Sequence, residues 1–412
     1  MPISKIIVAG AGPAGLILAL LLAKQGINVL VLDAAEKLDE QPRATHYSAP
    51  ATYELGRAGI LQEVIDKGFI PDGVTWRDLD GNAIGALSAQ SLSPENKMVC
   101  LPLNSLTRIA MEHLEKQPTV DIRWSHKVLP SIGQDESSAW VMVQTPNGEE
   151  KFSADYIVGC DGANSQIRKS LFGDGEFRGR TWDEQIVATN VYYDMSPYGW
   201  GDSNFIIDPE HWSMVSKIQP DGLLRVTYGD IPGLTREQYL DRQPMKFQSF
   251  LPGRPTPDKY RIVSISPYKV HQRCAKSFRE GRFLLVADAA HLCNPFGGLG
   301  LTGGLVDAGN LFDCLSGVHQ GLADENILSR YDEVRRNMYE SIIDPISSEN
   351  IRRLWQDPVK AREEDKFLEI CRKAETDPEL SRKMQEGLKA IMYDFRNEYH
   401  PSVRGAQSEL AA

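Results

Sequence analysis

The first part of the chain alternates short, fully apolar runs with stretches of helical character. Ile6–Ala9 and Val29–Leu32 are two such runs, and the apolar stretch from Leu16 to Lys24 lies between them and ends before Gly26. Apolar runs of this length are typical of strands buried on both faces, and two such strands joined by a helix form a parallel βαβ unit. The pattern predicts an α/β fold for this part of the chain.

The pattern becomes rich in predicted strands from about Trp182 to Arg273. Ile186–Tyr193, Trp212–Ile218 and Leu223–Tyr228 are predicted strands, and a proline-glycine turn separates the last two. The α/β pattern returns at Phe283. One domain interrupted by another is therefore predicted, and a pocket is expected at their interface.

The C-terminal part has a helical pattern that follows an Asp377-Pro378 start signal. Six apolar residues fall on one face at helical spacing: Leu380, Met384, Leu388, Ile391, Met392 and Phe395. We expect a helix that packs on the body of the protein or on a second subunit. The residues past about Tyr399 are expected to be loose.

A glycine turn joins the first predicted strand to the first helix, and the second strand ends in an acid. The turn is Gly10-Ala11-Gly12-Pro13-Ala14-Gly15, and the acid is Asp33. Gly10 suits a tight turn, Gly12 leaves room for a pyrophosphate, and Gly15 allows helix and strand to pack closely. Asp33 lies about 20 residues on, the spacing of a carboxylate that binds ribose hydroxyls. This order favours a dinucleotide site over a glycine turn without a ligand.

Two further apolar runs end in acids. Tyr156–Cys160 leads into Asp161-Gly162, and Phe283–Val286 leads into Asp288, after which a proline and a glycine cluster begin a helix. By itself an Asp-Gly turn is common, and Ser165 after it could simply cap a helix. With two other strand-end acids in the chain, a ligand site is favoured, because strand ends of α/β sheets hold nucleotide-like cofactors.

Composition narrows the class of protein. The 412 residues are 42% hydrophobic and 25% charged, ordinary globular values, and the net charge of −11 argues against a nucleic-acid partner. The apolar N-terminal stretch is broken by glycines and is short of the ~20 residues of a membrane span. Six cysteines without a C-x-x-C pair suit free thiols in a reducing compartment. We expect a cytoplasmic protein that binds neither membrane nor metal.

The three junctions in this order resemble the class A flavoprotein monooxygenases, the para-hydroxybenzoate hydroxylase-like family. Gly10-x-Gly12-x-x-Gly15 with Asp33 is similar to the family's FAD fingerprint, and Asp161-Gly162-x-x-Ser165-x-x-Arg168 to its second motif. Asp288-Ala289-Ala290-His291 with Pro295, Gly298 and Gly300 resembles the third motif, and Pro42-Arg43-Ala44 an early site beside the flavin. The resemblance spans roughly residues 1–345.

The resemblance implies FAD as cofactor and NADPH or NADH as co-substrate. It assigns residues 1–75, 100–172 and 279–345 to a Rossmann-like FAD-binding domain, 76–99 and 173–278 to a β-rich substrate domain, and 346–412 to a C-terminal helical segment. The residues expected to bind the cofactor are Gly10, Gly12, Pro13, Ala14, Gly15, Asp33, Ala34, Arg43, Arg108, Asp161, Gly162, Asp288, Pro295, Gly298, Gly300 and Leu301.

The chain departs from the family at four positions. Leu299 and Thr302 stand where the family usually has Gln and Asn, Ala287 where it has Gly, and Leu103 where Gln is frequent. These changes affect side-chain contacts to the flavin ring more than backbone contacts.

Candidate catalytic residues are His46, Arg225, Tyr228 and Pro295. Strand alternation places Arg225 and Thr227 on one face and Tyr228 on the other, so Arg225 or Tyr228 could orient a phenolate or carboxylate. The alternative, in which Arg225 faces solvent and Tyr228 packs in the core, fits the sequence equally well. His46 has a suitable intrinsic pKa for acid–base work, although a structural histidine is the alternative. Pro295 is expected beside the flavin ring.

The implied reaction is the hydroxylation or epoxidation of a small aromatic or polycyclic metabolite, with O2 added to the reduced flavin as a hydroperoxide. A cleft between domains would keep water away from that species. A flavin-dependent reductase or desaturase of the same superfamily is the alternative, and a non-catalytic nucleotide-binding protein a more distant one. A homodimer is a further expectation.

Overall fold

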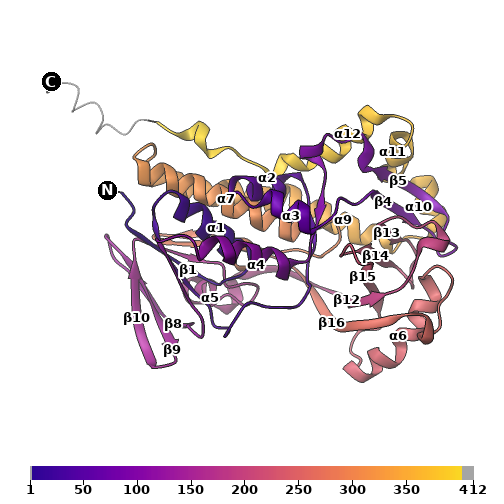
Figure 1. Cartoon of the computed structure of the whole chain (residues 1–412), viewed down its shortest axis with the longest axis horizontal. Helices are drawn as coiled ribbons and strands as arrows, with labels where there is room; N and C mark the ends of the chain where they lie inside the picture. Colours follow the sequence, from indigo (N-terminus) through magenta and orange to yellow (C-terminus); the bar gives the residue numbers. More distant parts are fainter. Residues whose placement is uncertain (1, 401–412) are drawn as a thin grey trace.

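One half of the molecule is built on a six-stranded sheet (Figure 1). The structure is a computed structural model that describes residues 2–400, so the expectation for the residues past Tyr399 lies outside the described residues but for His400. The strands, in spatial order, are β17 (Arg279–Glu280), β18 (Phe283–Leu285), β11 (Tyr156–Gly159), β1 (Lys5–Ala9), β2 (Asn28–Leu32) and β7 (Val120–Arg123).

Five of these strands are parallel, as the apolar runs predict. Val8 of β1 lies opposite Val31 of β2 and Val158 of β11, and Gly159 of β11 lies opposite Leu285 of β18. Only β17 runs antiparallel, next to β18. The carboxyl ends of β1, β2, β11 and β18 therefore meet at one edge, which brings the three sequence junctions together.

Helices cover this sheet. α1 (Pro13–Lys24) is buried from Ala14 to Ala23 because it packs against both α4 and α7. The other helices of this half are α2 (Ala49–Arg57), α3 (Leu61–Lys67), α4 (Leu103–Leu114), α5 (Gln166–Phe172), α7 (Leu299–Gln320) and α8 (Asn326–Met338). This half also contains a three-stranded antiparallel sheet of β8 (Lys127–Gln134), β9 (Ala139–Thr145) and β10 (Gly148–Ala154).

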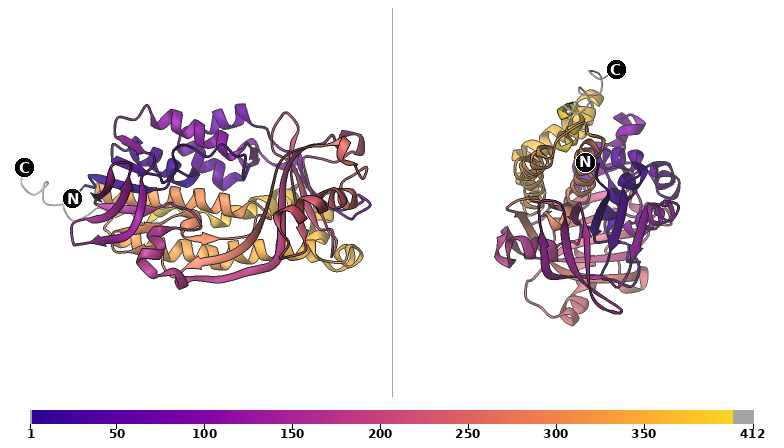
Figure 2. Two further views of the ribbon diagram at one scale, coloured as in Figure 1. Left: turned by 90° about the horizontal axis from the view of Figure 1, so that it is seen from below. Right: turned by 90° about the vertical axis from the view of Figure 1, so that its left-hand side faces the viewer.

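The other half is an eight-stranded sheet, and its strands come from separate parts of the chain. In spatial order they are β19 (His291–Leu292), β16 (Arg261–Ala275), β12 (Phe177–Tyr192), β15 (Leu223–Asp230), β14 (Ser213–Lys217), β13 (Ser203–Ile206), β4 (Gly73–Arg77) and β5 (Ala83–Ser88). α6 (Arg236–Phe250) packs on one face. Figure 2 shows the long β12 and β16 running along the molecule. The α/β domain interrupted by a β-rich one is thus confirmed, while its numerical boundaries stay a prediction.

A separate two-stranded sheet pairs β3 (His46–Tyr47) with β6 (Val99–Cys100). The C-terminal helices are α9 (Asp344–Leu354), α10 (Pro358–Glu364), α11 (Lys366–Ala374) and α12 (Pro378–Glu386). Asp377 caps α12 by accepting the N–H groups of Glu379 and Leu380, as its start signal predicts.

The prediction of a single amphipathic helix from Leu380 to Phe395 is wrong. α12 ends at Glu386, a 3-10 turn follows over Gly387–Ile391, and Met392 is extended. Gly387 has little helix propensity, and this explains the break at that residue. Ile391 and Phe395 are nevertheless buried, so the apolar pattern identified residues that pack on the body.

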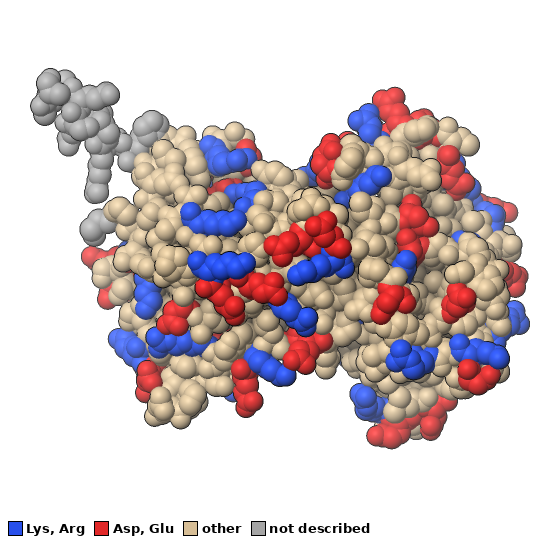
Figure 3. Space-filling view, in the orientation of Figure 1, with Lys and Arg blue, Asp and Glu red and all other residues tan. Residues whose placement is uncertain are grey.

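Positive and negative side chains are interspersed on the face shown in Figure 3. None of the helices within residues 2–400 combines the length and the apolar character needed to cross a membrane. The six cysteines are free thiols, as their spacing predicts.

Candidate active site

The first junction has the tight geometry that its glycines predict. Gly10 has a φ of 109°, and a side chain there would overlap the carbonyl of Cys160. A Cβ on Gly15 would overlap the carbonyl oxygen of Gly10. At Gly12 a Cβ would meet nothing within 4 Å, so the backbone there is open to a ligand. Asp33 accepts the N–H of Ala11 at 2.6 Å, and its carboxylate thereby steadies the turn.

At the second junction, Asp161 follows β11 and accepts the N–H groups of Gln166 at 2.7 Å and Ile167 at 3.2 Å. Burial raises the pKa of Asp161. Ser165 caps α5, as the simpler interpretation of this turn expected. Arg168 is buried and donates to the carbonyl oxygens of Ala163 and Ala289. The second junction is thereby bonded to the third.

The third junction carries Asp288 into the same space. Burial raises the pKa of Asp288. Ala287, which stands where the related family has Gly, adopts a φ of 56°, in the left-handed region that disfavours a side chain. Gly298 caps α7 with a φ of 66°, so the N-terminus of this 22-residue helix opens beside Asp288. A helix N-terminus favours negative charge through its unpaired N–H groups and its dipole.

A buried ionic network lies behind Asp288. Asp307 binds His291 Nε2 at 2.7 Å and Arg335 Nε at 2.6 Å, and it accepts the N–H of Ala287 at 3.1 Å. Burial by itself raises the pKa of Asp307, but His291 and Arg335 outweigh burial and hold this pKa at about 2. Arg335 also donates to the carbonyl of Ile391. His291 therefore braces the turn that follows Asp288.

All three junctions line one cavity of about 990 Å³. Residues of the eight-stranded sheet form another part of its wall, so the cavity lies between the two halves as expected. The lining residues from that sheet include Val74, Trp76, Phe205, Met214, Ser216, Arg225, Thr227, Tyr268 and Val270. Apolar and aromatic side chains with a few polar groups are typical of a site for a small organic ligand.

The predicted cofactor residues divide into two groups. Those that line the cavity are Gly12, Pro13, Ala14, Arg43, Gly162, Asp288, Pro295, Gly298, Gly300 and Leu301. Those that do not are Gly10, Gly15, Asp33, Ala34, Asp161 and Arg108. Gly10, Gly15, Asp33 and Asp161 shape the turns instead. Ala34 and Arg108 are exposed at the surface.

His46 and Arg225 both line the cavity. His46 Nδ1 is 2.8 Å from the hydroxyl of Thr45, while its Nε2 is buried without a hydrogen-bond partner. Burial and the charge of Arg225 lower the pKa of His46 to about 4. Arg225 donates to Asn190 Oδ1 at 2.6 Å and to the carbonyl oxygens of Pro42 and Arg43. Arg225 therefore faces the cavity rather than solvent and fastens the loop that carries Arg43.

Tyr228 does not lie in the cavity, so it is wrong as a catalytic candidate. It is fully buried on the other face of β15, where its ring contacts Phe247 and Phe250 of α6. Alternation had separated Tyr228 from Arg225 correctly, and the structure shows which of the two faces is the cavity.

The departures from the family pattern alter the wall near α7. Thr302 is 2.8 Å from the hydroxyl of Ser48, so a hydroxyl pair stands where an amide was expected. Leu299 is buried against Val306 and Tyr339 while also reaching the cavity. Leu103 donates its backbone N–H to Ala44, next to Arg43.

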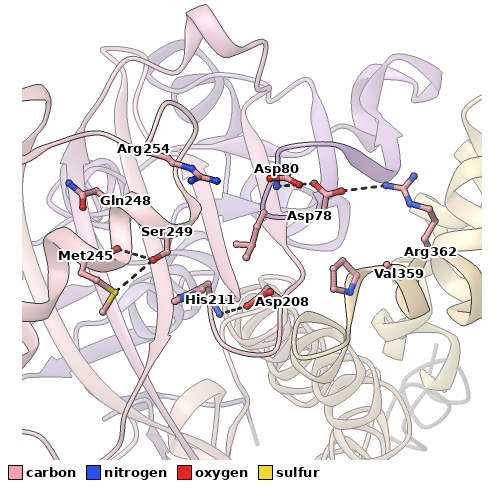
Figure 4. A pocket seen from close by; sticks show the side chains of 12 residues that line it. Asp78, Asp80, Asp208, His211, Met245, Gln248, Ser249, Arg254, Val359 and Arg362 are labelled. Carbon is pink, nitrogen blue, oxygen red and sulfur yellow. Dashed lines mark hydrogen bonds and ion pairs between the residues drawn. The ribbon is translucent and has the colours of Figure 1, made fainter.

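A second hollow of about 670 Å³ lies between α6, α10 and the loops of the eight-stranded sheet (Figure 4). Two of its three acids, Asp78 and Asp208, are engaged within the protein. Asp78 accepts N–H groups of its own turn and lies 3.7 Å from Arg362, and Asp208 accepts the N–H of His211. This hollow contains none of the predicted site residues. Across residues 2–400, no cluster of three or more His, Cys, Asp and Glu side chains could hold a metal ion.

The larger cavity fits a flavin dinucleotide. The N-termini of α1 and α7 open on it, Gly12 leaves backbone accessible, and the carboxylate of Asp288 faces it. These features define an α/β protein with a dinucleotide site shared between two domains.

Residues 4–345 match the family described as FAD binding domain, and the chain belongs to this family. It is 38% identical to the para-nitrophenol 4-monooxygenase of Pseudomonas sp. (strain WBC-3), over 84% of this chain and 86% of the relative. It is 34% identical to the 6-hydroxy-3-succinoylpyridine 3-monooxygenase HspB of Pseudomonas putida, over 85% and 89%. The crystal structure of p-nitrophenol 4-monooxygenase PnpA from Pseudomonas putida superposes with a TM-score of 0.89 at 35% identity, covering 95% of this chain and 99% of that one.

The chain is thus an FAD-dependent monooxygenase of the class A flavoprotein hydroxylases, and it acts on an aromatic substrate with O2. NADPH or NADH is the reductant typical of this family. The reductase or desaturase alternative and the non-catalytic alternative are set aside.

Proposed function

We propose that this enzyme oxygenates a phenol at the carbon para to its hydroxyl, where an electron-withdrawing substituent is already attached, and releases that substituent. Two relatives support this choice. In the names para-nitrophenol 4-monooxygenase and 6-hydroxy-3-succinoylpyridine 3-monooxygenase, the oxygenated ring position carries the substituent and lies para to the hydroxyl. The shared feature is the site of attack rather than the identity of the ring.

The observation that carries the proposal is the buried, unpartnered Nε2 of His46 in the cavity beside Arg225. A buried polar atom without a partner is costly, and a phenol hydroxyl would satisfy it. Because the pKa of His46 is about 4, its imidazole is neutral at pH 7, and its Nε2 can accept a hydrogen bond from the phenol hydroxyl. The positive charge of Arg225 favours the phenolate, whose para carbon is rich in electrons.

Bound FAD would supply electron transfer from NAD(P)H to O2 and an activated oxygen atom. We assign the open backbone at Gly12 and the N-terminus of α1 to the pyrophosphate, Asp288 to the ribityl chain, and the N-terminus of α7 to the flavin ring. With 4-nitrophenol, NAD(P)H supplies two electrons and one proton joins them. One oxygen atom enters the ring, the nitro group leaves as nitrous acid, and the products are benzoquinone, NAD(P)+ and one water.

The test uses the FAD-loaded enzyme with NAD(P)H, O2 and 4-nitrophenol. Attack at the substituted carbon releases one nitrite for each NAD(P)H consumed in coupled turnover, whereas attack beside the hydroxyl keeps the nitro group on a catechol. Labelled O2 should place one label in the organic product. A nitrocatechol product, or turnover of other phenols without loss of a para substituent, would overturn the proposal.

His46→Gln tests the role of the imidazole. His113→Gln is its control, because His113 of α4 pairs with Glu63 of α3, away from the cavity. We expect a fall in kcat/KM of about three- to tenfold for His46→Gln, the contribution of one hydrogen bond to the phenol hydroxyl. The His113 variant should retain wild-type turnover. Equal turnover of both variants would remove His46 from the reaction.

A further inference from the structure

An aromatic corner forms part of the cavity wall, and it combines two distant parts of the chain. Trp76 of β4 stacks on Phe205 of β13 with ring centroids 5.7 Å apart. Phe367, the second residue of α11, meets the same Trp76 ring edge-on at 5.2 Å. All three side chains line the cavity. Aromatic rings in such arrangements offer a flat apolar surface that suits another aromatic ring.

The ring of Phe367 is fixed from the side of the C-terminal helices. The guanidinium of Arg353 lies over it, 4.2 Å from the ring centroid. Arg353 is held in turn by Asp365, at 3.1 Å, and by Asn350 Oδ1, at 3.0 Å. Arg353 and Asp365 are each only 9% exposed. Because Asp365 also caps α11 by accepting the N–H of Phe367, side chain and backbone are positioned together.

α11 itself is anchored to the edge of the eight-stranded sheet. A Cβ on Gly85 of β5 would lie 3.3 Å from both Cys371 Cβ and the carbonyl oxygen of Leu368, so helix and strand are in close contact. Arg372 donates to the carbonyl of Ile84, and Glu375 accepts the N–H of Ala86. These bonds attach α11 firmly to the same sheet that carries Trp76.

We propose that Phe367 is a specificity-determining residue, which restricts the cavity to compact, single-ring phenols. The inference rests on the proposed function for its substrate class. Phe367 lies outside residues 4–345, the part of the chain that matches the FAD binding domain, so a substitution there leaves the matched segment unchanged. Arg353 is the positioning residue that holds the Phe367 ring against Trp76.

The test compares the affinities of oxidised, FAD-loaded enzyme for 4-nitrophenol and for the bulkier 4-hydroxybiphenyl, by equilibrium dialysis without NAD(P)H. Phe367→Ala should weaken 4-nitrophenol binding about three- to tenfold, the contribution of one aromatic contact. The same variant should bind 4-hydroxybiphenyl as tightly as wild type does, or more tightly. Phe367→Leu, which keeps most of the apolar bulk, should lie between Phe367→Ala and wild type.

Ile370→Ala is the matched control, because Ile370 is on the same helix, 39% exposed and outside the cavity. It should change neither affinity. If Phe367→Ala and Phe367→Leu shift both ligands equally, or behave like the Ile370 variant, the inference is overturned. Nitrite release by the wild-type enzyme tests the proposed function separately, since the affinity ratio of the two phenols requires no turnover.

Discussion

Asp307→Asn should destabilise the protein strongly, although it changes only one atom of the side chain. Asp307 and Arg335 have no exposed side-chain surface. The amide retains one acceptor oxygen, but its NH2 group would face a second hydrogen-bond donor, either the backbone N–H of Ala287 or the guanidinium of Arg335. The positive charge of Arg335 would also remain buried without its carboxylate.

Removing one partner of a buried ion pair costs about 3–5 kcal/mol. Arg335 keeps two other acceptors, the carbonyl of Ile391 at 2.6 Å and Asn310 Oδ1 at 3.3 Å, so we expect about 3 kcal/mol, at the lower end. At about 2 °C per kcal/mol for a chain larger than 150–250 residues, the melting temperature should fall by about 6 °C. The turn that carries Asp288 is held by the same Asp307 carboxylate, which accepts the N–H of Ala287. FAD should therefore be released at a lower temperature than from the wild-type protein.

Thermal unfolding of the FAD-loaded enzyme, followed by circular dichroism and by flavin fluorescence, measures both effects. Glu349→Gln is the control, because the Glu349–Arg352 pair is 65% and 51% exposed. Exposed pairs contribute about 0–1 kcal/mol, so this variant should melt within about 2 °C of wild type. If Asp307→Asn melts no lower than the control, the network does not stabilise the turn as argued.

Three further changes test other parts of the site. Ala287→Gly should raise the melting temperature, because it relieves a left-handed φ that costs about 1 kcal/mol. A lower melting temperature would mean that the contact between the Ala287 Cβ and Gly304 stabilises the protein by more than this strain costs. Gly15→Ala should abolish flavin binding, because its Cβ would overlap the carbonyl of Gly10. Flavin per protein after gel filtration measures this, and full flavin occupancy would contradict the geometry. The contribution of His46 to wild-type stability should fall as pH drops from about 6.5 to 4, because the unfolded chain protonates His46 at its ordinary pKa of 6.5 while the folded protein does so only at about 4. Denaturant titrations should show this slope flattened in His46→Gln, and equal slopes would contradict the lowered pKa.

The cofactor half of the site could be predicted from the sequence because its determinants are local. A strand, a glycine turn and an acid occupy a few consecutive residues at each junction, and parallel pairing then brings Asp161 and Asp288 to one sheet edge. The turn geometry at Gly10 and Gly15 follows from the same short stretch.

The substrate half depends on contacts between distant residues, so the sequence could not supply it. Alternation separated Arg225 from Tyr228 but carries no information about which face meets the cavity. Ser48, Trp76 and Phe367 were missed because each reaches the cavity from a different element. The C-terminal apolar pattern identified buried residues but not the break at Gly387, since spacing shows which residues share a face and not how long the helix lasts.

The two longest strands also limit how the molecule can move. β12 and β16 pair from Tyr192 opposite Arg261 to Phe177 opposite Ala275, with irregularities in the register after Thr181 and after Asn190. β19 of the third junction joins the end of β16. A hinge across this ribbon would break several backbone hydrogen bonds at about 1 kcal/mol each. Bending of one half against the other is therefore costly, and we expect the enzyme to admit a ring and exclude water mainly through displacements at the rim of the cavity.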